Sequence, residues 1–255
     1  MWWGGTTKTK HKHRLIIILS VTASLLLLTA AAFLIYVSIY YHADESGRKA
    51  MSSDSAVTVM EENGRIVFAP KKAEYGLIFY PGGKVEAEAY APLMHELANE
   101  GILCVIVKMP FNLAVFNIDG ADGIQTSYPD ISHWYIGGHS LGGSMAATYA
   151  EKHAASFDGL ILLASYSTSD LSGTDLLVLS VYGTEDRVLN RDKYKSNRSK
   201  LPENTKEYII DGGCHAYFGS YGLQDGDGEP SVTPEEQRRL TIKWLIEQIM
   251  TRDFR

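Results

Sequence analysis

A serine at a sharp turn is the first feature of this sequence that could do chemistry. Ser140 stands in WYIGGHSLGG (134–143), with a glycine two positions before it and another two positions after it. Apolar residues precede the serine and helix-forming residues follow it, so the chain is predicted to turn from a strand directly into a helix. The glycines let neighbouring backbone pass closely, which exposes Ser140 at the apex as a nucleophile for acyl transfer. The alternative is a glycine-rich turn without chemistry.

A histidine base is required, because a serine hydroxyl is a poor nucleophile at neutral pH until a base takes its proton and an acid orients that base. Of the eight histidines, only His153 and His215 come after Ser140, as the chain order serine, acid, histidine demands. His153 lies at the far end of the helix that starts at the serine, about 20 Å away at 1.5 Å per residue. His215 follows a predicted strand (207–210) and is the predicted base, with a surface loop histidine as the alternative. The earlier histidines, such as His139, are expected to be solvated or packed.

Three acids follow the carboxyl ends of predicted strands, the edge at which ligands bind in a doubly wound sheet. Asp186 is the predicted partner of His215, because YGTED leaves its strand through a glycine turn that can aim a carboxylate at the loop of His215. Glu185 is the second choice and Asp170 the third. A solvated turn carboxylate is the alternative interpretation of Asp186.

Acyl transfer also needs donors for the oxyanion that develops on the substrate. The backbone N–H of Leu141, at the start of the predicted helix, is one such donor. The second is expected from FYPGGK (79–84), a strand that runs into a Gly-Gly loop, through the N–H of Gly83 or that of Lys84. A phosphate cradle is the rival use of this loop, but the pattern Gly-x4-Gly-Lys-Ser/Thr is missing.

The elements that position these residues follow from the hydrophobic pattern. Apolar runs bounded by turn residues alternate with helical stretches, which predicts an α/β fold with a doubly wound, mostly parallel sheet covered on both faces. A hairpin (57–60 and 65–69) that turns at Asn63-Gly64 comes first. Strands are predicted at 76–80, 102–107, 134–136, 159–164, 176–181 and 207–210. Helices are predicted at 87–99, 121–127, 141–153 and 234–250, the last with a capping box at its start.

Composition narrows the classes of function. The chain has 255 residues, 45% of them hydrophobic and 21% charged, with a formal net charge of −6. Such a chain folds around a sizeable core, and neither disorder nor electrostatic binding of nucleic acid fits it. No Cys/His cluster offers a zinc site, DGDG (225–228) is interpreted as a turn rather than a calcium loop, and no metal or cofactor is expected. Cys104 and Cys214 are predicted at opposite edges of the sheet, and therefore as two free thiols.

The N-terminal part differs sharply from the rest. Residues 1–14 carry four basic and no acidic side chains, and residues 15–41 carry no charge. As a helix, 15–41 spans about 40 Å, enough to cross the roughly 30 Å of hydrocarbon in a bilayer. This predicts a basic cytoplasmic head (1–14), a single transmembrane signal anchor (15–41) in the lipid bilayer, a linker (42–55) and a domain (56–255) on the outer face of the cell membrane. The alternative is secretion after cleavage of a signal peptide.

Five stretches, read together, point to a known family: YPGGKVEAEAYAPL, VKMPFNLAVF, GGHSLGG, YGTEDRV and 212–228. Over nearly all of 57–250 the chain resembles the α/β-hydrolase superfamily, and within it the compact dienelactone-hydrolase-like group, also called α/β-hydrolase fold-5. The resemblance implies a triad of Ser140, Asp186 and His215, with an oxyanion pocket from Gly83 and Leu141. Dienelactone hydrolases use cysteine where Ser140 stands, so lactone specificity does not carry over. Cys214 precedes the base where a polar residue such as asparagine is expected.

The predicted function is hydrolysis of a small-molecule ester or related acyl substrate. Only 11 residues (165–175) join two strands beside the site, too few for a lid domain, so the site is expected to be open. Met109, Phe111, Leu113 and Phe116 follow a strand end and are expected to form an apolar wall for the acyl group, with core packing as the alternative. The rival functions are a surface-tethered binding protein without turnover, and an acyltransferase or peptidase that uses the same triad.

Overall fold

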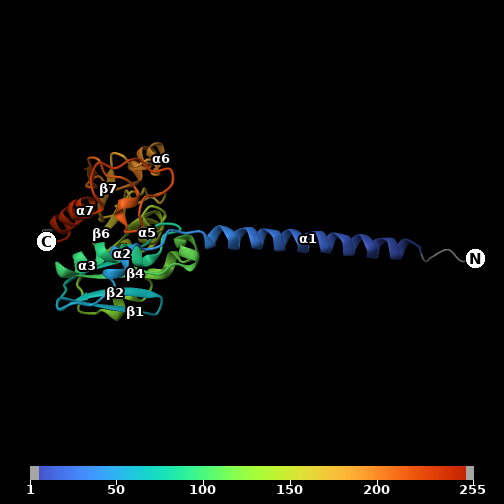
Figure 1. Ribbon diagram of the computed structural model, residues 1–255, viewed down its shortest axis with the longest axis horizontal. Coiled ribbons are helices and arrows are strands. Elements are labelled where there is room, and N and C mark those ends of the chain that lie inside the picture. The colour runs from blue at the N-terminus through green and yellow to red at the C-terminus, as the bar shows by residue number, and fades with distance from the viewer. Residues whose placement is uncertain (1–5, 251–255) are drawn as a thin grey trace, which may run out of the picture. The chain divides into compact units, whose positions relative to one another are not determined.

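The computed structural model describes residues 6–250, which form a long helix and a compact body (Figure 1). Helix α1 (Thr6–Ser38) is one unit, and the chain from Tyr40 onward folds as the other. Within α1, His11–Ser38 is long and apolar enough to cross a membrane, and it contains an 18-residue window with a mean hydropathy of 2.5. A signal sequence near an N-terminus has the same properties, so α1 is compatible with either an anchor or a signal peptide.

Within residues 6–250, the body contains one eight-stranded sheet of order β1-β2-β4-β3-β5-β6-β7-β8. The strands are β1 (Val57–Glu62), β2 (Arg65–Pro70), β3 (Tyr75–Tyr80), β4 (Ile102–Val107), β5 (His133–His139), β6 (Gly159–Leu163), β7 (Leu177–Gly183) and β8 (Lys206–Ile210). The β1–β2 hairpin turns at Asn63-Gly64, and β2 pairs antiparallel with β4. From β3 to β8 all pairs are parallel. The predicted mostly parallel α/β fold is confirmed.

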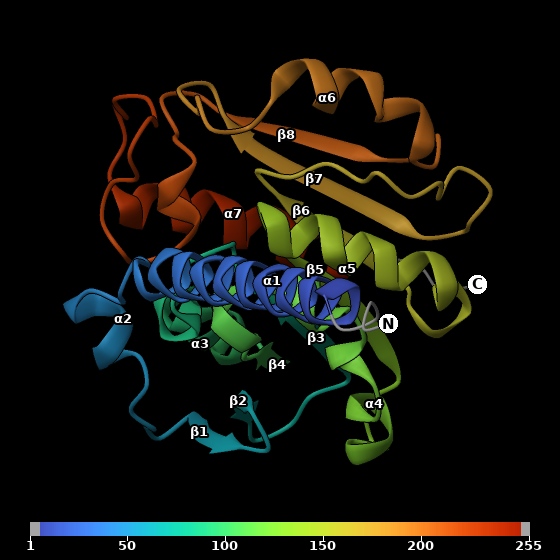
Figure 2. The same cartoon turned by 90° about the vertical axis from the view of Figure 1, so that its right-hand side faces the viewer.

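Helices cover both faces of the sheet. They are α2 (Glu45–Lys49), α3 (Ala91–Asn99), α4 (Ile124–Ser127), α5 (Leu141–Lys152), α6 (Arg191–Ser196) and α7 (Pro234–Ile249). Leu77 of β3 shares one buried cluster with residues of α3 and α7, whereas its neighbour Ile78 shares a second cluster with residues of α5. Successive side chains of a strand point to opposite faces, so α3 and α7 cover one face and α5 the other. Figure 2 shows α5 against β5 and β6.

Short 3-10 helices occupy many of the connections. They lie at Ala87–Tyr90, Pro110–Asn112, Ala114–Phe116, Ile118–Ala121, Ala154–Ser156, Arg198–Lys200 and Ala216–Phe218. The helix predicted over 87–99 therefore starts as a 3-10 turn, and α3 begins only where Pro92, which lacks an N–H, fits the first turn of an α-helix. The strand predicted over 134–136 runs on to His139, because it is enclosed by β3 and β6 and its glycines make room for them. A Cβ on Gly138 would lie 2.5 Å from a carbonyl oxygen of β3.

Residues 42–55, for which the composition suggests a linker, lie against the body. Asp44 caps α2, and its Oδ1 accepts a hydrogen bond of 2.9 Å from the N–H of Gly47. Gly47 is buried, and a Cβ there would lie 3.1 Å from the carbonyl oxygen of Glu88 and 3.3 Å from that of Ser220. The same small and polar residues make flexible linkers and capped turns, so composition alone does not separate the two.

The strand order places two loops at a crevice. The chain leaves β3 toward β4 on one side, while β5 pairs with β3 on the other side. At such a switch point, the loops that follow the two central strands diverge and open a crevice beyond the carboxyl ends. The loop after β3 carries Gly83, and the turn after β5 carries Ser140.

Candidate active site

Ser140 occupies the turn between β5 and α5. Its backbone has φ 51° and ψ −120°, a region that residues with a Cβ rarely adopt and that surrounding structure must enforce. The N–H of Ser140 donates to the carbonyl oxygen of Leu163 at the end of β6, over 2.9 Å. The strand therefore ends at the serine and the helix begins at the next residue, as the sequence predicts.

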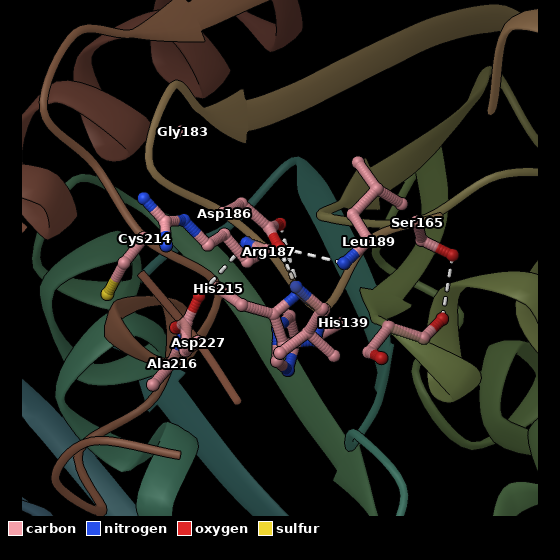
Figure 3. A network of polar contacts seen from close by, with 12 residues as sticks. His139, Ser165, Gly183, Asp186, Arg187, Leu189, Cys214, His215, Ala216 and Asp227 are labelled. Carbon is pink, nitrogen blue, oxygen red and sulfur yellow. Dashed lines mark hydrogen bonds and ion pairs between the residues drawn. The ribbon is translucent and has the colours of Figure 1, made fainter. Parts of the chain in front are cut away.

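His215 and Asp186 form a buried hydrogen-bonded pair (Figure 3). Nδ1 of His215 lies 3.0 Å from Oδ2 of Asp186, and the two side chains are 2% and 0% exposed. The other carboxylate oxygen accepts hydrogen bonds from the N–H groups of Val188 (3.0 Å) and Leu189 (2.8 Å). A carboxylate held in this way orients the imidazole through Nδ1 and leaves Nε2 for proton transfer.

Ser140 and His215 line the same cavity, which has a volume of about 240 Å³. Its other lining residues are Leu141, Ser144, Ala164, Ser165, Tyr166, Val188, Leu189 and Asn190. Among residues 6–250, the structure shows no hydrogen bond between Ser140 and His215. Contacts between a nucleophile and its base often tighten only when substrate binds. The structure thus brings the acid and the base into contact and places the serine in the cavity that the base lines.

A larger cavity of about 810 Å³ lies elsewhere, between α2 and α3. Its lining includes His95 and Asp54, whose Nε2 and Oδ2 atoms are 3.5 Å apart. None of its residues follows the carboxyl end of a strand, the place where ligands bind in a doubly wound sheet. We therefore assign the chemistry to the smaller cavity.

The alternative acids and the alternative base lie outside the cavity of Ser140. The Glu185 carboxylate contacts the hydroxyl of the preceding threonine at 3.4 Å. Asp170 is exposed, and hydrogen bonds from the hydroxyl and the backbone of Ser172 hold its pKa below the usual range. His153 stacks on a tyrosine ring at the far end of α5. Of the candidates, only Asp186 reaches His215 within the part of the chain that is described.

The loop after β3 (81–84), which carries the predicted second donor and is called the oxyanion loop below, lies against the start of α5. A Cβ on Gly83 would lie 2.9 Å from Cδ2 of Leu141, so the two predicted oxyanion donors belong to adjoining residues. The N–H of Lys84, the other candidate, donates to the carbonyl oxygen of Asn112 over 2.7 Å and is used within the fold. The N–H of Leu141 opens α5, where the helix offers it no acceptor. Gly83 and Leu141 remain the candidate pair.

The loop after β4 does not line the cavity. The residues predicted there as an acyl wall, Met109, Phe111, Leu113 and Phe116, are absent from its lining. Met109 and Leu113 are buried, whereas Phe111 and Phe116 are 49% and 51% exposed. The burial of Met109 and Leu113 agrees with the alternative of core packing, and the loop is bonded to Lys84, so it lies along the oxyanion loop.

A buried tyrosine and histidine, which the sequence analysis did not assign to the site, support the oxyanion loop. The hydroxyl of Tyr90 accepts a hydrogen bond of 3.0 Å from the N–H of Gly82 and lies 2.8 Å from Nδ1 of His139. Burial, and after it the neighbouring His215, hold the pKa of His139 well below its usual range. His139 is therefore neutral and pairs with the tyrosine hydroxyl. Its ring centroid is 4.5 Å from that of His215, so the pair connects the loop to the base.

Replacing Tyr90 by phenylalanine is expected to lower kcat/KM by about 10- to 100-fold, because the Gly82 N–H and the His139 Nδ1 lose a buried partner and the loop shifts. The measurement is steady-state hydrolysis of a soluble ester, with thermal unfolding to confirm that the variant is folded. Tyr208→Phe is the matched control, since it removes a hydroxyl from a half-buried residue of β8. Equal activity of the two variants would contradict the assignment.

Two further side chains hold the loop of His215. The Asp227 carboxylate accepts hydrogen bonds from the N–H of Ala216 at 2.9 Å and from the N–H of Arg187 at 3.3 Å (Figure 3). It therefore joins the loop that carries His215 to the loop that carries Asp186. Gln237 of α7 accepts from the N–H of Cys214 at 3.0 Å and donates to its carbonyl oxygen at 2.8 Å. The DGDG stretch (225–228) was predicted as a plain turn, and Gln237 was not predicted to contact the site. A polar residue on the buried face of the last helix was the available signal.

Both cysteines are free and buried, which confirms the prediction of two free thiols. Burial raises the pKa of the Cys214 thiol to about 12 and raises that of Cys104 as well. A thiol is a nucleophile as the thiolate, so neither cysteine competes with Ser140 at neutral pH. In the described residues, no group of three or more His, Cys, Asp and Glu side chains could hold a metal ion.

This chain is similar in sequence to a known family: the family model described as the alpha/beta hydrolase family matches residues 76–239. No curated protein matches the chain. Similar solved structures include Est1E from Butyrivibrio proteoclasticus, at 16% identity and TM-score 0.55, covering 77% of this chain and 100% of that one. A predicted CIB-like hydrolase from Thermoplasma acidophilum has 16% identity and TM-score 0.54, with 74% and 99% covered. TT1662 from Thermus thermophilus has 13% identity and TM-score 0.54, with 77% and 99% covered. At these identities the likeness supports the fold.

Proposed function

This chain belongs to the alpha/beta hydrolase family, and from that premise we propose that it is a membrane-anchored serine hydrolase that cleaves an ester or related acyl bond outside the cytoplasm. The observation that carries the proposal is the buried pair of Asp186 and His215, of which His215 lines the same cavity as Ser140. An ion pair that only stabilises the fold would not require a serine on a strained turn beside it, so the combination favours a catalytic role.

The proposed reaction starts with attack of the Ser140 hydroxyl oxygen on the acyl carbon, while Nε2 of His215 takes the hydroxyl proton. Asp186 holds the imidazolium through Nδ1. The negative charge that develops on the acyl oxygen is stabilised by the N–H groups of Gly83 and Leu141. The histidine then gives its proton to the leaving alcohol, which departs as the acyl-enzyme forms. Water activated by His215 releases the acid and restores the serine.

The dimensions of the cavity favour a short acyl group. A volume of about 240 Å³ lies below the usual range of roughly 300–1,000 Å³ for pockets that enclose drug-sized ligands. Ala164, Val188 and Leu189 offer apolar contact, and Ser144 and Asn190 offer polar contact. We infer that the acyl part is small and that the leaving group extends out of the cavity.

The anchor is the second part of the proposal. Helix α1 carries the length and hydropathy of a membrane span, and the basic residues of 1–14 precede its uncharged part, which begins at residue 15. Cations tend to stay on the cytoplasmic side, which sends the body to the outer face. Cleavage of α1 as a signal peptide and release of the body is the alternative, and the mass of the mature protein distinguishes the two.

A fluorophosphonate probe tests the catalytic part directly. We expect covalent labelling of the wild-type chain and its loss in both Ser140→Ala and His215→Ala, together with turnover of p-nitrophenyl acetate and butyrate above that of Ser140→Ala. Absence of labelling and turnover would favour the binding protein instead. Transfer of the acyl group to an added alcohol or amine would reassign the chain as an acyltransferase, and cleavage of peptides but not esters as a peptidase.

A further inference from the structure

The segment that leads from α1 into the body is fixed at the oxyanion loop. The N–H of Tyr41 donates to the carbonyl oxygen of Lys84 at 2.8 Å, and the N–H of Glu86 donates to that of Tyr41 at 2.9 Å. Tyr41 and Val85 form a parallel bridge. Since α1 ends at Ser38, the connection to Tyr41 can span at most about 10 Å.

The same loop borders the reacting groups. Gly83 lies against Leu141, the residue after the nucleophile, and the next residue, Lys84, bonds to Asn112 of the loop after β4. One loop therefore separates the attachment point at Tyr41 from Ser140. If α1 spans a bilayer, chain connectivity alone places this side of the body close to the membrane surface.

Exposed apolar side chains gather around this attachment point. In the body, within the residues described, the exposed large apolar side chains are Met60, Phe111, Val115, Phe116, Ile209, Leu223 and Met250. Phe111, Val115 and Phe116, which belong to the loop bonded to Lys84, are 49%, 44% and 51% exposed. Leu223, 57% exposed, lies in the segment whose Asp225 N–H donates to the hydroxyl of Tyr41 at 3.1 Å. These four form the anchor-side patch.

We propose that the anchor-side patch lies in the surface of the bilayer that holds α1, so that the active-site cavity opens beside the membrane. This inference rests on the proposed function, and it adds a substrate class: an amphiphilic ester with a short acyl group, presented at the lipid surface. Aromatic and aliphatic side chains favour the boundary between headgroups and hydrocarbon.

Fluorescence of a labelled chain tests the surface without using catalysis. The full chain is reconstituted in phosphatidylcholine vesicles with the environment-sensitive dye NBD on Phe116→Cys, and a doxyl-labelled phosphatidylcholine is the quencher. Both native cysteines are buried, so the new thiol is labelled selectively. We expect at least 3-fold stronger quenching at position 116 than at the control Ile209→Cys, on the exposed face of β8.

Activity then tests the substrate class. The probes are p-nitrophenyl butyrate, which is soluble, and a dialkyl ether glycerolipid with one butyryl ester, held in the vesicles. We expect Phe111→Ser combined with Phe116→Ser to lower the ratio of lipid to soluble turnover at least 10-fold. Ile209→Ser should leave that ratio unchanged. Because a ratio is compared, partial loss of folded enzyme does not imitate the effect.

The outcomes separate the two proposals. Quenching at position 116 without fluorophosphonate labelling overturns the catalytic proposal but supports membrane contact of the anchor-side patch. Fluorophosphonate labelling without quenching overturns the membrane contact alone. Self-quenching between labels on two copies also overturns it, because the patch would then contact a second chain. Failure of the wild-type chain to float with the vesicles overturns the anchor and, with it, this inference.

Discussion

Asp186→Asn is expected to lower kcat for a soluble ester by about 10⁴-fold, the loss that follows when the acid of a serine triad can no longer hold its histidine. The two oxygens of Asp186 have different partners here. Oδ1 accepts from the N–H groups of Val188 and Leu189, and Oδ2 lies against Nδ1 of His215. The single oxygen of asparagine stays with the two backbone donors, so its amide group faces Nδ1. An amide donates there, which forces the imidazole proton onto Nε2, the atom that must accept the proton of Ser140.

The control for this variant is Glu185→Gln. It makes the same chemical change one residue earlier, on a carboxylate outside the cavity, and should leave kcat within about 2-fold, as expected of a surface change away from the site. Steady-state kinetics from pH 5 to 9 and thermal unfolding of both variants are the measurements. A loss below about 10-fold in Asp186→Asn, or equal losses in the two variants, would remove Asp186 from the proposed triad.

The parts of the site that the sequence predicted are those encoded locally. A strand, a glycine turn and a helix follow each other around Ser140, and each step has its own residue signal. Asp186 and His215 were predicted from their positions after strand ends, and they lie in contact because parallel strands share one edge. Strand β5 was predicted too short, because Gly137 and Gly138 have low strand propensity. Their role, which is to make room for the neighbouring strands, is apparent only when β3 and β6 are seen to enclose β5.

The parts that were missed are contacts between segments far apart along the chain. Tyr90 and His139 are separated by 49 positions, and Gln237 and Cys214 by 23. Their bonds depend on which segments the fold brings together, so the polar residue on the buried face of α7 could be noticed in the sequence but its partner could not. The position of the predicted acyl wall also depends on such contacts, because a backbone hydrogen bond joins that loop to Lys84.

The second large effect is expected from a single methyl group at Gly142. A Cβ there would lie 2.1 Å from the carbonyl oxygen of Tyr80 and 2.3 Å from that of Pro81. Both are backbone atoms at the end of β3, so no side chain can move aside. The residues after Pro81 form the oxyanion loop, and the residue before Gly142 provides the other donor. Gly142→Ala must therefore separate α5 from β3 and move the N–H groups of Gly83 and Leu141 apart.

We expect Gly142→Ala to lower kcat/KM by about 10²- to 10³-fold, as the loss of one oxyanion donor does, and to destabilise the body by about 1–3 kcal/mol through overpacking. Gly173→Ala is the matched control, because a Cβ there meets nothing within 4 Å and its φ is not positive. That control should change neither activity nor unfolding temperature appreciably. Thermal unfolding and steady-state kinetics measure both effects. A folded Gly142→Ala variant with full activity would show that the two donors need not be held at this spacing, and would refute the proposed oxyanion pocket.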